Sequence, residues 1–405
     1  MDQTPRGNRI HIAIFGGRNA GKSSLINALT NQDIALVSSV PGTTTDPVYK
    51  AMEIQPVGPV VIIDTAGIDD EGELGQLRVQ RSLEVLNQAD MALLVIDATT
   101  GATEFDENIA RICREKKLPI VSVINKNDIF PVTAKLMEQT TQRLDMTPMV
   151  TSALTGQGIV DLKMAIMKAV PPGWDEQPIV GDLLNPGDLA VLVVPIDTAA
   201  PKGRLILPQV QTIRDILDHN AMAYVVKESE LQECIQSLQK TPRIVITDSQ
   251  AFQKAAEATP PEVLLTSFSI LFARYKGELE TLVAGAKAID NLQPGDKVLI
   301  AEACTHHRLE DDIGTVKIPR LLRRFVGGEL DFQWSSGVRL PAELSQYKLI
   351  VHCGACMINR REMLARLMQA QAAGVPIVNY GVCIAYVLGI LKRALSPFPQ
   401  LRSSL

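Results

Sequence analysis

The stretch Gly16-Gly17-Arg18-Asn19-Ala20-Gly21-Lys22-Ser23 reads G-x-x-x-x-G-K-S. It follows an apolar run at residues 10–15 that predicts a buried strand, and it precedes residues 24–29, the start of a predicted helix. Strand, glycine-rich loop and helix are the context in which this motif binds phosphate. The glycines let backbone N–H groups approach the phosphates, and the helix N-terminus adds partial positive charge. The stretch therefore predicts a phosphate-binding loop in an α/β domain.

Individual side chains of this loop have separate expected roles. Lys22 supplies a positive point charge for the outer phosphates and is the first residue expected to act in catalysis. The Ser23 hydroxyl is placed to bind Mg²⁺. Further contacts to the nucleotide are expected from Gly16, Asn19, Ala20, Gly21 and Ser24.

Two later segments are expected to respond to the terminal phosphate. Residues 38–46 form a polar loop with proline, glycine and threonine, in which Thr44 is expected to reach Mg²⁺ and the last phosphate. A buried strand predicted at residues 60–63 ends at Asp64, which can hold Mg²⁺ directly or through water. The N–H of Gly67 can sense the terminal phosphate. Thr44 and Gly67 therefore complete the expected catalytic set.

The sequence Asn125-Lys126-Asn127-Asp128 follows a strand predicted at residues 120–124 and reads N-K-x-D. A carboxylate at Asp128 accepts paired hydrogen bonds from the N1–H and the exocyclic amine of guanine. Adenine presents no such pair of donors and would leave the carboxylate unpaired, at a cost of about 1–3 kcal/mol or more. Residues Ser152, Ala153 and Leu154 are expected to form the loop behind the base. The nucleotide is therefore predicted to be GTP or GDP.

Four motifs in this order, each at the end of a strand, resemble those of the translation-factor-related small GTPases over residues 8–170. The similarity is closest to the branch of tRNA-modification and ribosome-assembly GTPases. Ile68 follows the D-T-A-G motif, where many signalling GTPases carry a glutamine that orients water. In related GTPases an asparagine at the position of Asn19 binds K⁺. The resemblance therefore implies a GTP hydrolase with slow intrinsic turnover that K⁺ stimulates.

Composition limits the classes of partner. The 405 residues are 46% hydrophobic and 4% aromatic, with a formal net charge of -5. Few aromatic residues argue against stacking platforms for nucleic acid, and the negative charge argues against a polyanionic partner. Neither a signal segment nor a transmembrane helix is predicted. We therefore expect a cytoplasmic protein with no nucleic-acid or membrane partner, in which the six cysteines are thiols or metal ligands.

A proline- and glycine-rich stretch at residues 171–178 predicts a domain boundary. Beyond it, strands predicted at residues 189–194, 221–226 and 243–247 alternate with helices. This alternation indicates a small α/β domain. An exposed edge strand in so small a domain can pair with a second copy of the chain.

In the last third of the chain, two predicted strands end in cysteines and histidines. Residues 297–301 lead to Cys304-Thr305-His306-His307, and residues 348–351 lead to His352-Cys353-Gly354-Ala355-Cys356. Ligands of parallel sheets bind beyond the carboxyl ends of the strands, so the two groups are expected to converge. Before them, residues 262–292 predict one long helix.

The expected ligands of a metal centre are Cys304, Cys353 and Cys356. Three thiolates with a variable fourth ligand suit a [4Fe–4S] cluster that has one replaceable iron position. They also suit a zinc site of three cysteines and one histidine. His306 and His352 are each explained equally well as the fourth ligand or as supporting neighbours. Cys383, in an apolar helix, is expected in the core.

A GTPase, a small α/β segment and a C-x-H … H-C-x-x-C segment in this order resemble the maturation GTPases of [FeFe]-hydrogenase over essentially the full chain. The resemblance implies an α/β protein of three domains. These are a P-loop GTPase domain at residues 1–172 with a mostly parallel sheet and helices on both faces, a dimerisation domain at 179–261, and a parallel-sheet iron–sulfur domain at 262–405.

The same resemblance implies what such a protein does. It implies a homodimeric scaffold that binds a [4Fe–4S] cluster, receives a two-iron precursor and delivers it to apo-[FeFe]-hydrogenase. Two radical-SAM maturases are implied as further partners. GTP hydrolysis would switch contacts with these partners and would not perform the cluster chemistry.

Two other functions compete with this interpretation. One is an RNA-modification or ribosome-assembly GTPase with a structural zinc. It requires a basic face, for which residues 317–324 are the candidate, and a solvated helix face accounts better for that stretch. The other is a non-enzymatic adaptor whose GTP state controls its protein contacts. Measured GTP turnover distinguishes such an adaptor from an enzyme.

Overall fold

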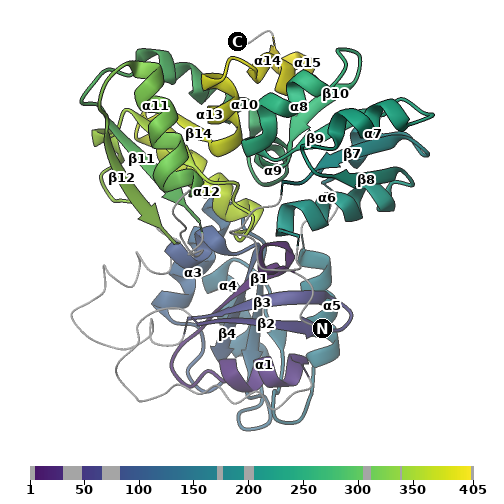
Figure 1. The fold of residues 1–405 in the computed structure, drawn as a ribbon. Coiled ribbons are helices and arrows are strands. Elements are labelled where there is room, and N and C mark those ends of the chain that lie inside the picture. Colours follow the sequence, from purple (N-terminus) through teal and green to yellow (C-terminus); the bar gives the residue numbers. More distant parts are fainter. Residues whose placement is uncertain are drawn as a thin grey trace. The chain divides into compact units, whose positions relative to one another are not determined.

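The structure, a computed structural model, describes residues 5–30, 48–65, 83–170, 177–195, 205–303, 312–337 and 340–402. The chain divides into two compact units, Met1–Asp175 and Glu176–Leu405 (Figure 1). In the described part of the chain, every helix is too short or too polar to cross a lipid bilayer.

The first unit is built on a six-stranded sheet in the order β2-β3-β1-β4-β5-β6. Its strands are β1 (Ile10–Phe15), β2 (Val48–Ile54), β3 (Gly58–Asp64), β4 (Met91–Asp97), β5 (Ile120–Asn125) and β6 (Met149–Val150). Its helices include η1 (Arg6–Asn8), α1 (Lys22–Thr30), α3 (Glu104–Glu115), α4 (Ala134–Leu144) and α5 (Ile159–Ala169). All strand pairs are parallel except β2 with β3, which is antiparallel.

Alternate residues of the central strand β1 enter two different cores. Ile12 and Ile14 belong to a core that includes Leu25 of α1, whereas Ala13 and Phe15 belong to one that includes Ile109 of α3. A strand with helices on both faces is buried along its whole length, as all six residues of β1 are. This confirms the predicted α/β fold with helices on both faces of a mostly parallel sheet.

The second unit contains two four-stranded sheets, and every strand pair in them is parallel. The middle sheet has the order β10-β9-β7-β8, from β7 (Leu189–Val193), β8 (Met222–Val226), β9 (Ile244–Thr247) and β10 (Leu264–Ser267). The C-terminal sheet has the order β12-β11-β13-β14, from β11 (Lys297–Glu302), β12 (Asp331–Ser336), β13 (Leu349–His352) and β14 (Ile377–Asn379).

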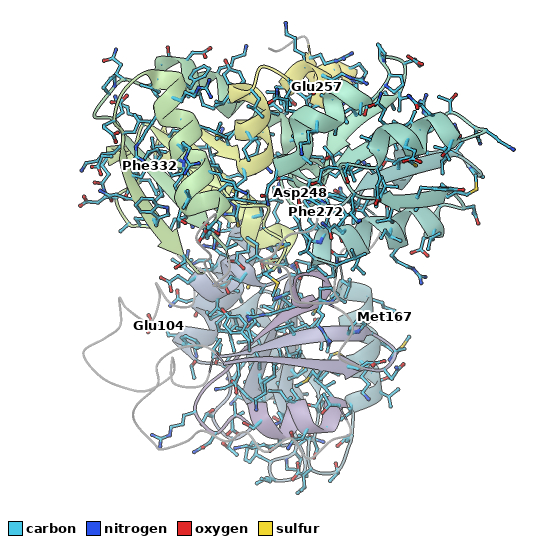
Figure 2. All side chains as sticks on the ribbon, in the orientation of Figure 1. Glu104, Met167, Asp248, Glu257, Phe272 and Phe332 are labelled. Atoms are coloured by element: carbon cyan, nitrogen blue, oxygen red, sulfur yellow. The ribbon has the colours of Figure 1, made fainter. Side chains whose placement is uncertain are left out.

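Helices and 3₁₀ or π turns connect these strands. They are η2 (Gly181–Leu183), α6 (Leu207–Asp218), α7 (Leu231–Ser237), η3 (Ser249–Ala251), α8 (Phe252–Ala258), α9 (Phe268–Lys276), α10 (Leu279–Ala286), η4 (Lys287–Asn291), η5 (Ile313–Lys317), α11 (Ile318–Val326), η6 (Leu344–Gln346), α12 (Arg360–Ala372), α13 (Tyr380–Val387), α14 (Leu391–Ala394) and α15 (Pro399–Arg402). Figure 2 shows Phe272 of α9 in the interior of this unit and Glu257 of α8 on its surface.

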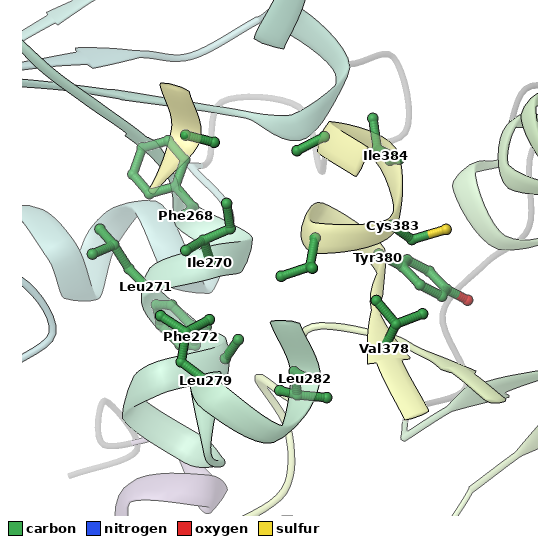
Figure 3. Close-up of a cluster of buried hydrophobic side chains, with 14 of the residues drawn as sticks. Phe268, Ile270, Leu271, Phe272, Leu279, Leu282, Val378, Tyr380, Cys383 and Ile384 are labelled. Atoms are coloured by element: carbon green, nitrogen blue, oxygen red, sulfur yellow. The ribbon is translucent and has the colours of Figure 1, made fainter. Parts of the chain in front are cut away.

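The two sheets of the second unit share one hydrophobic core. Figure 3 shows the α9 side chains Phe268 and Phe272 in the same cluster as Val378 and Cys383. Burial raises the pKa of the Cys383 thiol to about 12, so this sulfur is not a thiolate near neutral pH. The core position predicted for Cys383 is thus confirmed.

The prediction of one long helix at residues 262–292 is wrong. Residues Leu264–Ser267 form strand β10, which pairs in parallel with β9, and two separate helices follow. The Ser267 hydroxyl accepts a hydrogen bond from the Ile270 N–H and so caps the start of α9. Because β10 completes the middle sheet, that sheet extends beyond the boundary expected between residues 261 and 262.

Candidate functional site: a nucleotide loop and a cysteine-bearing sheet edge

The phosphate-binding loop lies between β1 and α1, as its motif predicts. Lys22 is the first residue of α1, and its Nζ donates hydrogen bonds to the carbonyl oxygens of Gly16 at 2.5 Å and Gly17 at 3.1 Å. The ammonium is therefore held inside the loop. Ser23 and Asn19 are exposed at the same loop, and Asn19 has a positive φ of 64°.

Gly16 has a backbone that no other residue fits. Its φ is 146°, and a Cβ added there would lie 2.1 Å from the carbonyl oxygen of Val95 in β4. At Gly17, by contrast, an added Cβ would meet no atom within 4 Å. A side chain is therefore excluded at Gly16 but has room at Gly17. Alanine substitutions at these two positions form a matched pair of variants.

We predict that Gly16→Ala destabilises the first unit by about 3 kcal/mol, because the new methyl group overlaps the β4 backbone and a positive φ is imposed on alanine. Binding of a fluorescent GDP analogue should be lost with it. Gly17→Ala should keep both properties. Thermal unfolding and nucleotide titration of the two variants measure this, and equal behaviour would contradict the assigned loop geometry.

Asn125 joins the base-binding motif to the phosphate-binding loop. Its Nδ2 donates to the Ala20 carbonyl at 3.0 Å, and its Oδ1 accepts from the Ala153 N–H at 3.0 Å. A Cβ on Gly21 would lie 2.4 Å from this Nδ2, so the glycine is needed for the approach. Asp128 Oδ1 accepts a 2.5 Å hydrogen bond from the Ser152 hydroxyl. The structure thus brings the predicted base residues together.

The sequence interpretation missed one partner of this motif. Asp97, at the end of β4, forms a 2.7 Å ion pair with Lys126, and the two side chains are 12% and 25% exposed. The same carboxylate accepts from the Thr99 N–H and hydroxyl. Its position at the carboxyl end of a central parallel strand was the signal that could have found it.

The predicted Mg²⁺ residues are only partly described. Asp64 is the last residue of β3 and is 4% exposed, next to Thr65, whose hydroxyl donates to the Ile14 carbonyl at 2.6 Å. Leu154 is 83% exposed in the loop behind the base. Thr44 and Gly67 lie outside the described residues, so their expected roles stay predictions.

The C-terminal sheet brings two cysteine-bearing strand ends together. The N–H of Ala303, just after β11, donates to the Sγ of Cys353, just after β13, at 3.2 Å. Ala303 directly precedes Cys304, which lies outside the described residues together with His306. Cys353 is buried and Cys356 is half-buried. The convergence expected from the sheet topology is therefore seen between the strand ends.

His352 lies directly behind this cysteine loop and is fully buried. Arg366 Nη1 lies 2.9 Å from its Nε2, and its Nδ1 lies 2.8 Å from the Cys353 carbonyl oxygen. Burial, with the nearby Arg366 charge, lowers the pKa of His352 to about 3. A neutral ring with both nitrogens engaged fits the supporting role, which the sequence had left open beside direct ligation.

Two further side chains at this edge were not anticipated. Glu302, the last residue of β11, is 2% exposed, and its Oε1 accepts from the Tyr380 hydroxyl at 3.3 Å. Burial raises the pKa of Tyr380, and the charges of Cys353 and Glu302 raise it further. A glutamate one residue before the Ala303-Cys304 pair was a visible signal. No group of three or more metal-binding side chains occurs within the described ranges, which exclude Cys304.

The nucleotide loop, the base motif and their mostly parallel sheet define the class of this protein: it contains a P-loop GTPase domain. The family model of the 50S ribosome-binding GTPases matches residues 11–126, which confirms the predicted GTPase and its nucleotide. The model of the hydrogen maturase F dimerization domain matches residues 179–277, and that of the hydrogen maturase F tetramerization domain matches residues 280–397. Together the last two span more than half of the chain, and the chain belongs to the hydrogen maturase F family.

Curated relatives are similar in part. The tRNA modification GTPase MnmE of Nitrosomonas europaea is 35% identical over 166 residues, which cover 41% of this chain and 35% of that protein. GTPase Der of Kosmotoga olearia is 36% identical over 166 residues, or 38% of this chain and 37% of that protein. The chain thus spans about a third of the length of these relatives. A solved structure of a probable GTP-binding protein engB aligns with 22% identity and a TM-score of 0.33, over 40% of this chain and 98% of its own.

Proposed function

We propose that this protein is a GTPase that also serves as an iron–sulfur scaffold, and that it assembles and delivers a two-iron precursor to apo-[FeFe]-hydrogenase. The observation that supports the second role is the hydrogen bond from Ala303 N–H to Cys353 Sγ at 3.2 Å. It places the strand end that continues into Cys304 against the strand end that carries Cys353 and Cys356.

The residues of this edge fit an iron–sulfur cluster. Sulfur ligands of clusters accept backbone N–H hydrogen bonds, which together with burial tune the cluster's potential. Cys304, Cys353 and Cys356 would hold three irons, and the fourth iron would keep an exchangeable position. A cluster supplies one-electron chemistry and bridging sulfides when it is bound. A zinc site of three cysteines and one histidine would find no free nitrogen on His352, because both nitrogens of that ring are engaged, and it would need another histidine such as His306.

GTP hydrolysis in the first unit would switch the contacts that the protein makes with its partners. Hydrolysis would remove the terminal phosphate that Thr44 and Gly67 are expected to sense, and so alter binding of the two radical-SAM maturases. The cluster chemistry itself would take place at the C-terminal sheet. If the two sites act separately in this way, GTP hydrolysis should persist when the cluster site is removed, and cluster binding should persist when the nucleotide site is removed.

We predict that K⁺ stimulates hydrolysis, because the exposed Asn19 of the phosphate-binding loop would hold the cation beside the transferred phosphate. Replacing Na⁺ by K⁺ at equal ionic strength should raise kcat about tenfold or more in the wild type. Asn19→Ala should lose this stimulation and keep the rate seen in Na⁺. Phosphate release under both cations measures it, and equal wild-type rates in the two salts would refute a K⁺ site.

Strand β8 offers a surface for a homodimer. It is an edge of the middle sheet, and Met222, Tyr224 and Val225 are 45%, 49% and 45% exposed. An apolar strand at a sheet edge can pair with another strand. We propose that a second copy of the chain covers it.

Val225→Lys should therefore weaken the dimer about tenfold or more, because a charged side chain on an edge strand opposes pairing. Sedimentation equilibrium of the wild type and the variant measures the dissociation constant. Val160→Lys in α5, at a position that is 72% exposed, is the control and should leave it unchanged. A Val225→Lys dimer as tight as the wild type would show that β8 is not the interface.

The delivery role is tested by activation of apo-[FeFe]-hydrogenase. Protein loaded with the two-iron precursor should produce hydrogen-evolving enzyme, and the same protein carrying Cys353→Ser should not. An RNA-modifying or ribosome-assembling GTPase would instead retain RNA in a filter-binding assay at moderate salt. RNA retention without hydrogenase activation would overturn the proposed function.

A further inference from the structure

Arg366 is a buried cation at the back of the cysteine-bearing edge. It lies on α12, which follows the cysteine loop, and it is 3% exposed. Its Nη2 donates to the Gly337 carbonyl at 2.6 Å and lies 3.3 Å from Glu362 Oε1, one turn earlier on the same helix. Its Nη1 contacts His352 Nε2 at 2.9 Å. One guanidinium therefore reaches both the end of β13 and the residue that follows β12.

The contact with His352 fixes the position of the ring proton. A guanidinium has donors and no acceptor, so His352 Nε2 must accept. The proton of the neutral ring is then on Nδ1, which donates to the Cys353 carbonyl. Arg366 thus orients the backbone of the first cysteine of the loop through one intervening side chain.

The contact with Gly337 reaches the other cysteine-bearing strand. The Gly337 N–H donates to the Glu302 carbonyl at 2.9 Å, at the end of β11. Glu302 is followed by Ala303, whose N–H donates to Cys353 Sγ. The hydrogen bonds from Arg366 therefore run to both strand ends that carry the cysteines.

We infer that Arg366 is a positioning residue of the cluster site: it holds the β11 and β13 ends at the spacing that the cluster requires, and it places a fixed positive charge beside that site. This inference rests on the proposed function. A nearby cation stabilises the reduced, more negative state of a cluster and so raises its reduction potential. The spacing of the strand ends affects iron loading, and the charge affects the reduction potential. Different variants of Arg366 remove these two contributions.

Arg366→Met removes both the donors and the charge. After anaerobic reconstitution we expect iron loading to fall about tenfold and the midpoint potential of the residual cluster to shift to a more negative value. Arg366→Lys keeps the charge and loses the planar fork, so loading should fall while the potential stays near that of the wild type. Arg360→Met is the matched control. Arg360 is on the same helix, but it donates to the carbonyls of Arg274, Tyr275 and Gly277 at the end of α9.

A second readout uses the iron-free protein. Long-range ¹H–¹⁵N correlation spectra should show His352 protonated at Nδ1 in the wild type and in Arg360→Met, with that signal changed in Arg366→Met. His352→Gln assigns the signal. Wild-type loading and potential in Arg366→Met would overturn the inference and leave the proposed function intact. Should that variant not fold, wild-type loading in Arg366→Lys would overturn it in the same way. A wild-type protein that takes up no iron would contradict the proposed function. The His352 signal of the iron-free protein would still show whether Arg366 orients the cysteine loop.

Discussion

Cys353→Ser should abolish iron–sulfur binding and leave GTP hydrolysis at the wild-type rate. Cys353 Sγ is the sulfur that joins the two strand ends, since it accepts the Ala303 N–H at 3.2 Å. A serine hydroxyl is a poor ligand for iron in clusters, which are held by thiolates. The nucleotide residues belong to a different compact unit of the chain, Met1–Asp175. Iron and sulfide content, the visible spectrum and phosphate release measure both halves of this expectation.

Cys234→Ser is the control for that variant. Cys234 is half-buried on α7 of the middle segment, and burial raises the pKa of its thiol, so it is not expected to bind metal. It should keep both the cluster and the hydrolysis rate. Loss of hydrolysis in Cys353→Ser to the same extent as loss of the cluster would show that the two sites are not separable modules.

Asp128→Asn should lower the affinity for GTP about 100-fold and bring XTP into use. The Asp128 carboxylate accepts the two donors of guanine, and an amide in its place offers a donor where an acceptor is needed. Xanthine presents an oxygen where guanine has the exocyclic amine, so the amide suits it. Ser152 donates to Asp128 Oδ1 and holds the side chain in place for either base.

Competition titrations with GTP, ATP and XTP measure this change in base preference. Asp145→Asn is the control, because Asp145 pairs with Arg114 at 2.9 Å on the surface of the same unit. It should bind GTP as the wild type does. An Asp128→Asn protein that still prefers GTP over XTP would contradict the assignment of the base-binding motif.

Much of the first site could be predicted from the sequence because its motifs are local. The loop at residues 16–23 and the motif at residues 125–128 each follow a buried apolar strand, and the structure places both as predicted. The meeting of the two cysteine groups was predictable for a different reason, since parallel strands direct their carboxyl ends to one edge.

Other features depend on contacts that no local pattern encodes. The run Leu264–Ser267 has only four residues, of which two are leucines, and it continues into a largely apolar helix, so periodicity does not separate strand from helix there. Arg366 lies 14 positions from His352 and reaches Gly337 across 29, and either contact exists only once the sheet has formed. Asp97 likewise finds Lys126 through the pairing of β4 with β5.

The central claim is that one chain joins a guanine-specific GTPase to a cluster held by three cysteines. Its most direct test is the count of iron and acid-labile sulfide in anaerobically reconstituted protein, with zinc measured in the same sample. We predict about four irons and four sulfides per chain, with loss of both in Cys304→Ser, Cys353→Ser and Cys356→Ser. One zinc per chain with no sulfide, or an unchanged iron content in the three variants, would contradict it.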